Sequence, residues 1–340
     1  MKRFVTFGEI MLRLNPEGFL RLVQADRLEA TYAGGEANVA VSLASFGDEV
    51  AFVTKLPENP LGEAARNALR QFGVATDEIV WGGRRLGVYF VEKGASQRSS
   101  RVIYDRVDSS IACATRGDFD WDRILAGVDW FHFTGITPAL GGELPDICAD
   151  ALACCRRQGI TVSCDLNYRS RLWSREDSGR TMTRLMPFVD VLIANEADAA
   201  DVFGIAAEGS DVDKGSLSKP GYVSVACQLA ERFGTKKVAI TLRTSISASR
   251  NLWAGMLYAD GEAFFSREYD LQIVDRVGSG DSFVGGLLHA IALGMGNSEA
   301  IEFAVAASAL KHSIEHDFNI VSEAEVSALA AGGGAGRIQR

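Results

Sequence analysis

Several familiar signatures are missing from this chain of 340 residues, and each absence removes a class of protein. No apolar run reaches the roughly 18 residues of a membrane span, so the sequence predicts no transmembrane helix. No Gly-x-x-x-x-Gly-Lys-Ser/Thr segment occurs, which excludes a Walker-type phosphate loop. No Gly-x-Gly-x-x-Gly follows the first predicted strand, at residues 4–7, and this argues against a dinucleotide-dependent dehydrogenase.

Paired cysteines and an excess of positive charge are missing as well. None of the six cysteines forms a Cys-x-x-Cys pair, so we expect reduced thiols in a cytoplasmic protein. Residues 1–3 lead directly into the strand-like run at residues 4–8, which is not typical of a cleaved signal peptide. The formal net charge of -9 argues against nucleic acid or an anionic membrane as a partner. An anionic small molecule would therefore need a local basic pocket.

What the sequence does contain is an alternation of strand-like and helix-like segments. This alternation predicts an α/β fold with a mainly parallel sheet that is covered by helices on both faces. The clearest strand-like runs are residues 4–7, 50–54, 128–133, 160–164, 189–194 and 238–242. The helix-like segments between them include residues 37–46, 61–72, 149–157 and 225–233.

Two stretches do not fit the alternation. Residues 20–33 and 87–107 have period-two character, and residues 88–92 and 101–106 could form a hairpin. We assign both stretches to a small β lid, with segments at about 11–33 and 85–110, inserted in a single domain that spans residues 1–330. The polar stretch 208–222 is expected to be an exposed loop, and the glycine-rich tail 331–340 is expected to be disordered.

The most informative stretch is the turn at residues 274–283, which passes Gly278, Ser279 and Gly280 and enters an apolar helix-like run. A Gly-x-Gly turn at a helix start leaves backbone N–H groups unpaired, and the helix dipole favours negative charge there. The turn is a natural anion site, yet it carries the carboxylate Asp281. Two interpretations stay open on these residues alone. Asp281 either caps the helix, or it accepts a proton from an attacking hydroxyl beside a bound phosphate.

A second glycine turn, Gly34 and Gly35, precedes the helix-like segment at residues 37–46. It is either a tight turn or a place where the backbone approaches a sugar closely, because glycine permits both. Asn38 has the matching ambiguity, since its side chain is suited to capping a helix and to binding a hydroxyl group.

Together, the two glycine turns resemble the motifs of one family. Residues 275–281, Asp-x-x-Gly-x-Gly-Asp, are similar to the C-terminal motif of the ribokinase-like (PfkB) sugar kinases, and residues 34–47 are similar to the N-terminal motif. Residues 8–14, 31–38 and 165–173 resemble the 2-keto-3-deoxygluconate kinase branch. The resemblance implies a ribokinase-like fold. It also implies ATP- and Mg2+-dependent phosphorylation of the terminal hydroxyl of 2-keto-3-deoxygluconate, giving 2-keto-3-deoxy-6-phosphogluconate.

The resemblance implies roles for individual residues on the substrate side. Asp281 would be the catalytic base, and the turn at residues 278–280 would form the anion hole. A sugar acid needs a cation for its carboxylate, preferably the planar fork of arginine, and Arg106 and Arg169 lie on matching segments. The residues expected to bind the substrate are Gly34, Gly35, Asn38, Tyr89, Tyr104, Arg106, Asn167 and Arg169.

On the nucleotide side, residues 307–313 resemble the same branch, and the small residues there would leave room for an adenine ring. Asp198 stands where the family has Glu in an Asn-x-x-Glu element associated with magnesium, and Glu196 would share this work through bound water. His312, taken alone, is more often a structural histidine. The residues expected to bind ATP are Asn195, Thr241, Arg243, Gly278, Gly280, Ala309 and His312.

Two other functions stay open at this point. One is another kinase of the family, acting on fructose, ribose or a related deoxy-keto acid, and the other is a catalytically silent sugar-acid-binding protein. The lid of family members often pairs with the lid of another subunit, so the resemblance also implies a homo-oligomer formed through the lid. The other expected partners are the sugar acid and ATP.

Overall fold

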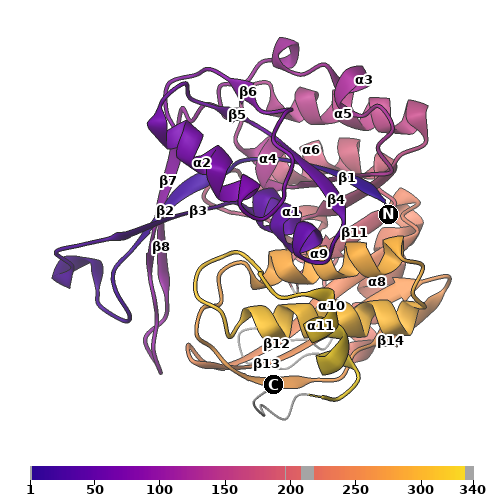
Figure 1. The fold of residues 1–340 in the computed structure, drawn as a ribbon. Coiled ribbons are helices and arrows are strands. Elements are labelled where there is room, and N and C mark those ends of the chain that lie inside the picture. Colours follow the sequence, from indigo (N-terminus) through magenta and orange to yellow (C-terminus); the bar gives the residue numbers. More distant parts are fainter. Residues whose placement is uncertain (1, 196, 208–217, 334–340) are drawn as a thin grey trace.

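The computed structural model of the protein describes residues 2–195, 197–207 and 218–333. Within these ranges the main element is a nine-stranded sheet with the order β14-β13-β12-β11-β10-β9-β1-β4, and β15 pairs with β13 (Figure 1). Its strands are β1 (Arg3–Phe7), β4 (Glu49–Val53), β9 (Trp130–Thr134), β10 (Thr161–Asp165), β11 (Val191–Ala194), β12 (Lys237–Ser247), β13 (Arg250–Ala259), β14 (Glu262–Phe265) and β15 (Tyr269–Gln272).

The predicted parallel core of this sheet is confirmed. The six strand-like runs of the sequence correspond to β1, β4, β9, β10, β11 and β12, and all neighbouring pairs among them are parallel. The sheet continues through β13, β14 and β15, whose pairings are antiparallel; the alternation of strands and helices in the sequence does not predict this extension.

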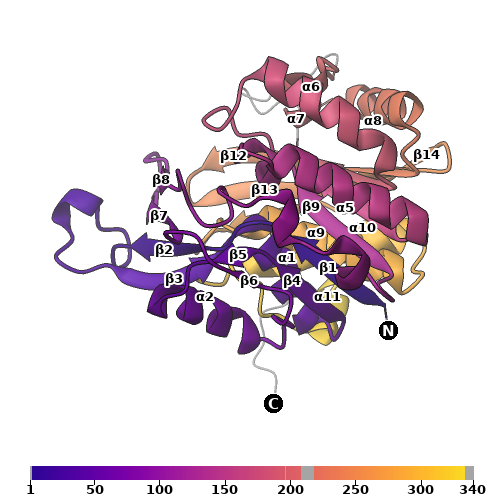
Figure 2. The ribbon, with the colours of Figure 1, turned by 90° about the horizontal axis from the view of Figure 1, so that it is seen from above.

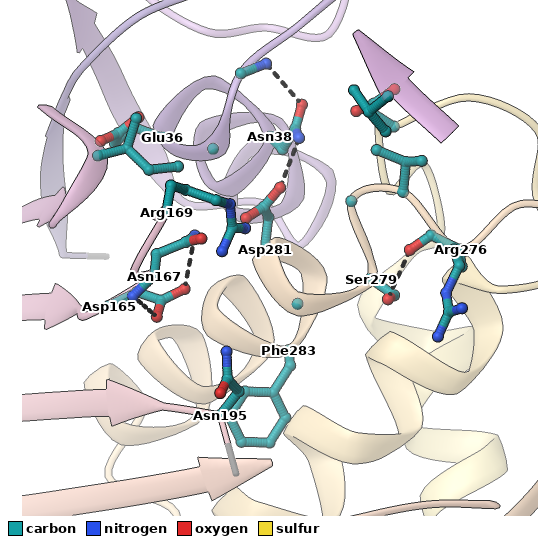
Figure 3. A pocket seen from close by; sticks show the side chains of 18 of the residues that line it. Glu36, Asn38, Asp165, Asn167, Arg169, Asn195, Arg276, Ser279, Asp281 and Phe283 are labelled. Carbon is teal, nitrogen blue, oxygen red and sulfur yellow. Dashed lines mark hydrogen bonds between the residues drawn. The ribbon is translucent and has the colours of Figure 1, made fainter. Parts of the chain in front are cut away.

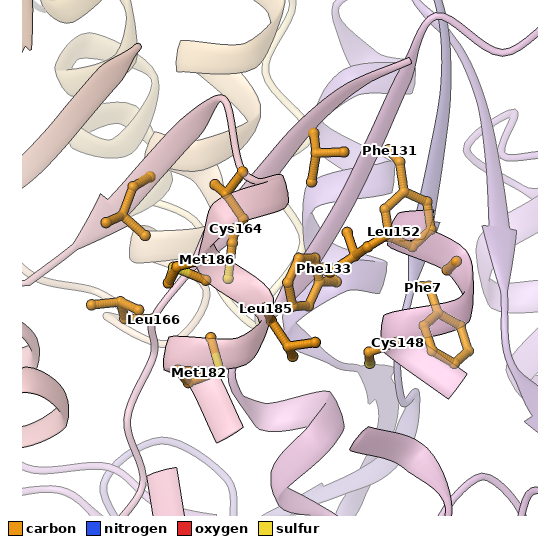
Figure 4. Packing of buried hydrophobic residues seen from close by; sticks show 14 of the residues in the cluster. Phe7, Phe131, Phe133, Cys148, Leu152, Cys164, Leu166, Met182, Leu185 and Met186 are labelled. Carbon is orange, nitrogen blue, oxygen red and sulfur yellow. The ribbon is translucent and has the colours of Figure 1, made fainter. Parts of the chain in front are cut away.

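Helices cover both faces because the strand side chains alternate between two hydrophobic clusters. On β9, Phe131 and Phe133 belong to one cluster and Trp130 to the other. Figure 2 shows the two helical layers, and Figure 4 shows the first cluster, where the strands pack against α5 and α6. One layer holds α3 (Trp121–Ile124), α4 (Ile136–Ala139), α5 (Leu144–Gln158), α6 (Arg175–Leu185), α7 (Asp198–Phe203) and α8 (Lys219–Phe233). The other holds α1 (Gly35–Ser45), α2 (Pro60–Arg70), α9 (Ser279–Ala292), α10 (Asn297–Lys311) and α11 (Glu323–Ala330).

A second sheet projects from one side of the main body (Figure 1). It has the order β3-β2-β7-β8, and we call it the lid sheet. The predicted hairpin is confirmed, since β7 and β8 are antiparallel partners. The strands are β2 (Met11–Asn15), β3 (Glu29–Ala33), β7 (Gly87–Glu92) and β8 (Arg101–Asp105), and a two-stranded sheet is formed by β5 (Lys55–Leu56) and β6 (Val80–Trp81).

The structure corrects two local predictions. Residues 20–33 are not strand-like throughout, because Leu22–Gln24 form the 3-10 turn η1. The predicted loop 208–222 is wrong at its end, where α8 starts at Lys219; Ser218 accepts a hydrogen bond from the Gly221 N–H, and proline is tolerated in a first helical turn. Residues 208–217 lie outside the described residues. Two further 3-10 turns are η2 (Arg116–Asp118) and η3 (Met186–Phe188).

The predicted disordered tail is described only at its start. There the N–H groups of Ala331, Gly332 and Gly333 bond back to carbonyls of α11. Residues 334–340 lie outside the described residues. The six cysteines are all free thiols, as expected. Among the residues the structure describes, no helix combines the length and apolarity that a membrane crossing requires.

Candidate active site

A cavity of about 430 Å³ lies where the lid sheet meets the carboxyl ends of the parallel strands, with α1 and α9 starting at its wall. Ligand sites are common at this edge of open α/β sheets. Figure 3 shows how side chains from these separate elements converge there. The predicted site residues that line the cavity are Gly34, Gly35, Asn38, Tyr89, Tyr104, Arg106, Asn167, Arg169, Asn195, Asp198, Thr241, Arg243, Gly278, Ser279, Gly280 and Asp281.

The glycine turn before α9 has the geometry of an anion site. Gly278 is the N-cap residue with φ 81°, a left-handed conformation, and a Cβ on it would lie 2.0 Å from the carbonyl oxygen of Asp317. Only glycine fits there. The N–H of Val277 bonds to Asp275 Oδ1 at 3.0 Å, and the N–H of Ser279 bonds to the carbonyl of Arg276. The N–H groups of Gly278 and Gly280 are therefore the candidates for binding an anion.

Asp281 lies inside the first turn of α9, so the helix-cap interpretation of this residue is wrong: the cap is Gly278. The Asp281 carboxylate is half-buried in the cavity and accepts a hydrogen bond from Asn38 Nδ2 at 2.6 Å. Burial raises the pKa of Asp281 to about 7, against the lowering effect of the Asn38 hydrogen bond. Nearby carboxylates, Asp317 and Glu36, raise this pKa further. The side chain can thus hold or release a proton near neutrality.

Asn38 links the two glycine turns. Its Oδ1 accepts the N–H of Gly34 at 3.3 Å, which is the cap-like role, while its Nδ2 donates to Asp281. Gly34 itself is required by packing, because a Cβ there would lie 1.8 Å from the carbonyl oxygen of Glu9. Gly35 is close to the base as well, since a Cβ on it would lie 3.8 Å from Asp281 Oδ1. The N-termini of α1 and α9 therefore meet at the proposed reacting group.

Glu36 fixes the start of α1 and was not among the predicted site residues. Its buried Oε1 accepts hydrogen bonds from the Thr134 N–H at 3.1 Å, Thr134 Oγ1 at 2.7 Å and Thr137 Oγ1 at 2.5 Å. Burial raises the pKa of Glu36 in spite of these bonds. Because Asn38 is half a turn further along the same helix, Glu36 holds the partner of Asp281 in place.

Arg106 lies at the lid side of the cavity and is only 8% exposed. It forms an ion pair with the buried Glu9, in which its Nε donates to Glu9 Oε2 at 2.7 Å. Glu9 Oε1 also accepts a hydrogen bond from Ser109 Oγ at 2.6 Å. The guanidinium stacks over the Tyr104 ring, which in turn stacks on Tyr89. The charge of Arg106 is therefore already balanced within the protein.

Arg169 is different, because its side chain is exposed and its guanidinium bonds to the backbone carbonyl of Tyr168 at 2.9 Å. In Figure 3 it points toward Asp281, and its charge acts to lower the pKa of Asp165, Asp198 and Asp281. Burial and the neighbouring carboxylates nevertheless hold the pKa of Asp165 well above its usual value.

Asn167 sits between these groups, with φ 41°, and donates from Nδ2 to Asp165 Oδ2 at 3.2 Å. This left-handed conformation is uncommon for a residue with a side chain, although asparagine is among those that tolerate it. The turn places Asn167 and Arg169 on the same wall of the cavity as Asp165.

Only some of the residues predicted to bind ATP line the cavity. Thr241, Arg243 and Asn195 line the cavity, but Ala309 and His312 are not among its described lining residues. His312 is buried, bonds through Nδ1 to the carbonyl of Ser308 at 2.7 Å and packs edge-on against a tryptophan. Burial lowers its pKa to about 4, so this histidine is neutral at physiological pH. A direct ATP contact of His312 or Ala309 stays a prediction.

Asp198, one of the two residues predicted to bind magnesium, already uses its carboxylate oxygens in hydrogen bonds within the protein. Both oxygens of Asp198 accept backbone N–H groups, from Tyr168 at 3.2 Å and from Asn195 at 2.9 Å. Glu196 lies outside the described residues. Within the described ranges, no three His, Cys, Asp or Glu side chains form a cluster suited to a metal ion. Magnesium keeps several waters and is commonly held by one or two carboxylates with substrate phosphates, so water-mediated binding by Asp198 and Asp165 fits this site.

A mainly parallel α/β sheet with a lid sheet, an anion turn at a helix start and a carboxylate beside it defines a ribokinase-like protein. The chain belongs to the pfkB family of carbohydrate kinases, since the family model described as pfkB family carbohydrate kinase matches residues 1–314. The expected fold and family are thus confirmed, and the protein is a carbohydrate kinase.

Individual relatives agree with this assignment over nearly their full lengths. The chain is 51% identical to 2-dehydro-3-deoxygluconokinase from Thermotoga maritima, whose crystal structure superposes on this one with a TM-score of 0.94. The match covers 97% of this chain and 98% of that one. It is 34% identical to 2-dehydro-3-deoxygalactonokinase from Haloferax volcanii, covering 98% of both. A fructokinase from Xylella fastidiosa solved with bound ATP has the same fold, with 19% identity and a TM-score of 0.77, covering 97% of this chain and 98% of that one.

Proposed function

We propose that this kinase transfers the γ-phosphoryl group of ATP to the terminal hydroxyl of 2-keto-3-deoxygluconate, with Mg2+. The observation that carries the proposal is the position of Asp281, which directly follows the anion turn and shares one cavity with Arg106 and Arg169. Burial raises the pKa of this carboxylate to about 7. The kinases of Thermotoga maritima and Haloferax volcanii, whose names specify 2-dehydro-3-deoxy sugar acids, support a substrate of this class.

Asp281 would act as the general base. In its ionised form it accepts the proton of the terminal hydroxyl while the hydroxyl oxygen attacks the γ-phosphorus and the bond to the ADP oxygen breaks. Asn38 holds the carboxylate by its hydrogen bond at 2.6 Å and favours the ionised form. The base is therefore oriented before the substrate arrives.

The glycine turn would stabilise the charge on the transferring group. The N–H groups of Gly278 and Gly280 and the positive end of the α9 dipole would face the phosphate group on which negative charge increases. Magnesium, when bound, would neutralise phosphate charge, and Asp198 and Asp165 are positioned to hold its waters. Thr241, Arg243 and Asn195 would contact the nucleotide from the strand ends.

At the other end of the cavity, Arg106 and Arg169 would recognise the substrate carboxylate. The two arginines would do so unequally, because Glu9 already balances the charge of Arg106. Arg106 would orient the acid through its remaining N–H donors, and Arg169 would supply the net positive charge. Tyr89, Tyr104 and Asn167 would contact the hydroxyl groups, and the lid sheet would exclude water and limit ATP hydrolysis.

We also propose that residues 1–330 act as one catalytic domain and that two copies associate through their lid sheets. Apolar side chains are exposed on the lid, including Val23 at 91%, Phe19 at 55% and Ile103 at 50%. Exposed apolar patches of this kind commonly mark interaction surfaces. Sedimentation of the chain with and without the double substitution Val23→Glu, Ile103→Glu tests the association. A dimer that persists in the substituted chain would rule out this surface.

The substrate is tested by coupled ADP release with ATP and magnesium across 2-keto-3-deoxygluconate, its galacto epimer, fructose, ribose and gluconate. We expect turnover to be confined to the keto-deoxy acids. Turnover on fructose or ribose instead would support another activity within the family. Turnover on none of them, with binding of the acid detected by thermal shift, would support a silent sugar-acid-binding protein.

A further inference from the structure

A cluster of buried charges lies directly behind the anion turn, and its centre is Arg13 on the lid strand β2. This side chain is fully buried, yet its guanidinium reaches two carboxylates. Nη2 bonds to Asp275 Oδ2 at 2.6 Å, and Nη1 bonds to Asp317 Oδ1. Burial alone would lower the pKa of Arg13, but Asp317 and Asp275 outweigh this effect and raise it. The arginine is thus a permanent charge held between two aspartates.

Both aspartates support the backbone of the anion turn. Asp275 accepts the N–H of Val277 through Oδ1, and the carbonyl oxygen of Asp317 lies against Gly278 at the position a Cβ would need. Buried Lys311 reinforces the same place, since its Nζ donates to the carbonyl of Asp275 at 3.2 Å. The conformation that presents the Gly278 and Gly280 N–H groups therefore depends on this cluster.

The same cluster also reaches the sugar end of the cavity. The hydroxyl of Tyr89 donates to Asp317 Oδ2 at 2.9 Å, and the Tyr89 ring lines the cavity beside Tyr104. Lys93, at the end of β7, pairs with Glu315 in the segment that leads to Asp317. Arg13, Tyr89 and Lys93 all come from the lid side, whereas their partners belong to the phosphate end.

Simple stability is a poor explanation for such a cluster. Replacing a buried ion pair by well-packed apolar groups is often neutral or stabilising, so a buried arginine bridging two elements points to a demand for defined geometry. The planar fork of arginine meets two carboxylates at once, which an ammonium group on a flexible stem does less well.

We propose that Arg13 is a positioning residue that couples the two ends of the active site. Through Asp275 and Asp317 it holds the anion turn, and through Asp317 and Tyr89 it connects that turn to the lid strands. Substrate bound beneath the lid and phosphate bound at the turn then strengthen each other's binding. This inference rests on the proposed function, because it assigns the substrate to the lid end and the nucleotide to the turn.

The test is the Arg13→Lys variant, which keeps a positive charge between the aspartates but removes the fork. Calorimetry gives the affinity for a non-hydrolysable ATP analogue with magnesium, alone and with saturating 2-keto-3-deoxygluconate. In the parent protein we expect the sugar acid to tighten analogue binding at least about fivefold, with the reciprocal effect of equal size. In Arg13→Lys we expect the factor to fall below about twofold, kcat to fall, and the affinity for the sugar acid at saturating nucleotide to weaken by about the lost part of the factor.

Arg85→Lys is the matched control, since Arg85 pairs with Asp105 of the lid sheet at a partly exposed position. It should keep the parent's linkage factor. An unchanged factor in Arg13→Lys, or no linkage in the parent protein, would overturn the proposal and leave the cluster a packing feature. If Arg13→Lys does not fold, Asp317→Asn replaces it, because it keeps the Tyr89 contact and removes one charge; the linkage should again fall.

Failure of the proposed substrate would look different. The parent protein would then not bind 2-keto-3-deoxygluconate at all, and the linkage would be measured with whichever sugar of the panel is phosphorylated. If no sugar of the panel is phosphorylated, the affinity for the ATP analogue alone remains as a test. An affinity that is the same in Arg13→Lys as in the parent protein would show that Arg13 does not hold the anion turn in place.

Discussion

The two ends of the cavity are built in different ways. The phosphate end depends on one short stretch, in which a left-handed glycine at 278 and the carboxylate of Asp281 follow each other along the chain. The sugar end is assembled from the end of β1, the lid strands and the turn after β10. A motif within one turn can be recognised in a sequence, whereas a pocket made of distant segments depends on how their charges meet. The clearest case is Glu9, which neutralises one of the two predicted carboxylate-binding arginines.

The largest expected effect tests the phosphate end. Asp281→Asn keeps the shape and the Asn38 contact region but removes the base, so kcat should fall by about 10²–10⁴-fold. Steady-state kinetics on the sugar acid measures this. Asp270→Asn, at an exposed position paired with Arg250, is the control and should keep full activity. Near-parental turnover of Asp281→Asn would show that another group is the base.

The next effect tests whether Arg169 and Arg106 contribute different amounts of charge to binding the substrate carboxylate at the sugar end. Arg169→Ala removes the net charge that would face the carboxylate, and kcat/KM for the keto acid should fall by about 10–100-fold, the worth of a charge-assisted hydrogen bond. Fructose or ribose turnover, if measurable, should change much less. Arg106→Ala leaves Glu9 buried without its partner, so it should also lower the melting temperature, which Arg169→Ala should not. Equal losses of stability in both variants would contradict the distinction.

A pH profile joins the two ends through Asn38. Because the base must be ionised, log kcat/KM should rise with slope one below about pH 7 and level off above it, following the pKa of Asp281. Asn38→Ala removes a hydrogen bond that favours the ionised form, so the break should move up by about 0.5–1 pH unit. If the profile of Asn38→Ala levels off at the same pH as that of the parent protein, Asn38 does not set the pKa of Asp281. This holds whatever value kcat/KM reaches above that pH.

The smallest expected effect concerns Glu9. Glu9→Gln leaves the charge of Arg106 unbalanced, and the KM for the keto acid should fall by about two- to fivefold, because the substrate carboxylate then faces a net positive charge. The KM for ATP should not change. Ser109→Ala, which removes only the hydroxyl that donates to Glu9, is the control, since the ion pair stays in place. A raised KM in Glu9→Gln would mean that Glu9 orients Arg106 more than it neutralises it.

Much of the fold could be predicted because its determinants are local. Strand and helix periodicities located the parallel core, and the hairpin of the lid sheet followed from its alternating pattern. The sequence does not predict the antiparallel extension through β13 to β15, and it suggests a loop at the start of α8, whose first turn contains Pro220 and Gly221. Helix-breaking residues in the first turn of a helix cost little stability, so composition is a poor guide to where a helix starts.

The sequence by itself determined which residue types form the anion turn, since glycine at 278 readily adopts a left-handed conformation and the carboxylate follows three residues later. The tertiary structure alone decided the electrostatics around it. Arg106 meets Glu9 across 97 residues of sequence, and Arg13 meets Asp317 across 304. The conformations open to a glycine are a local property of the chain, but the energy of a buried charge depends on which partners packing brings within hydrogen-bond distance.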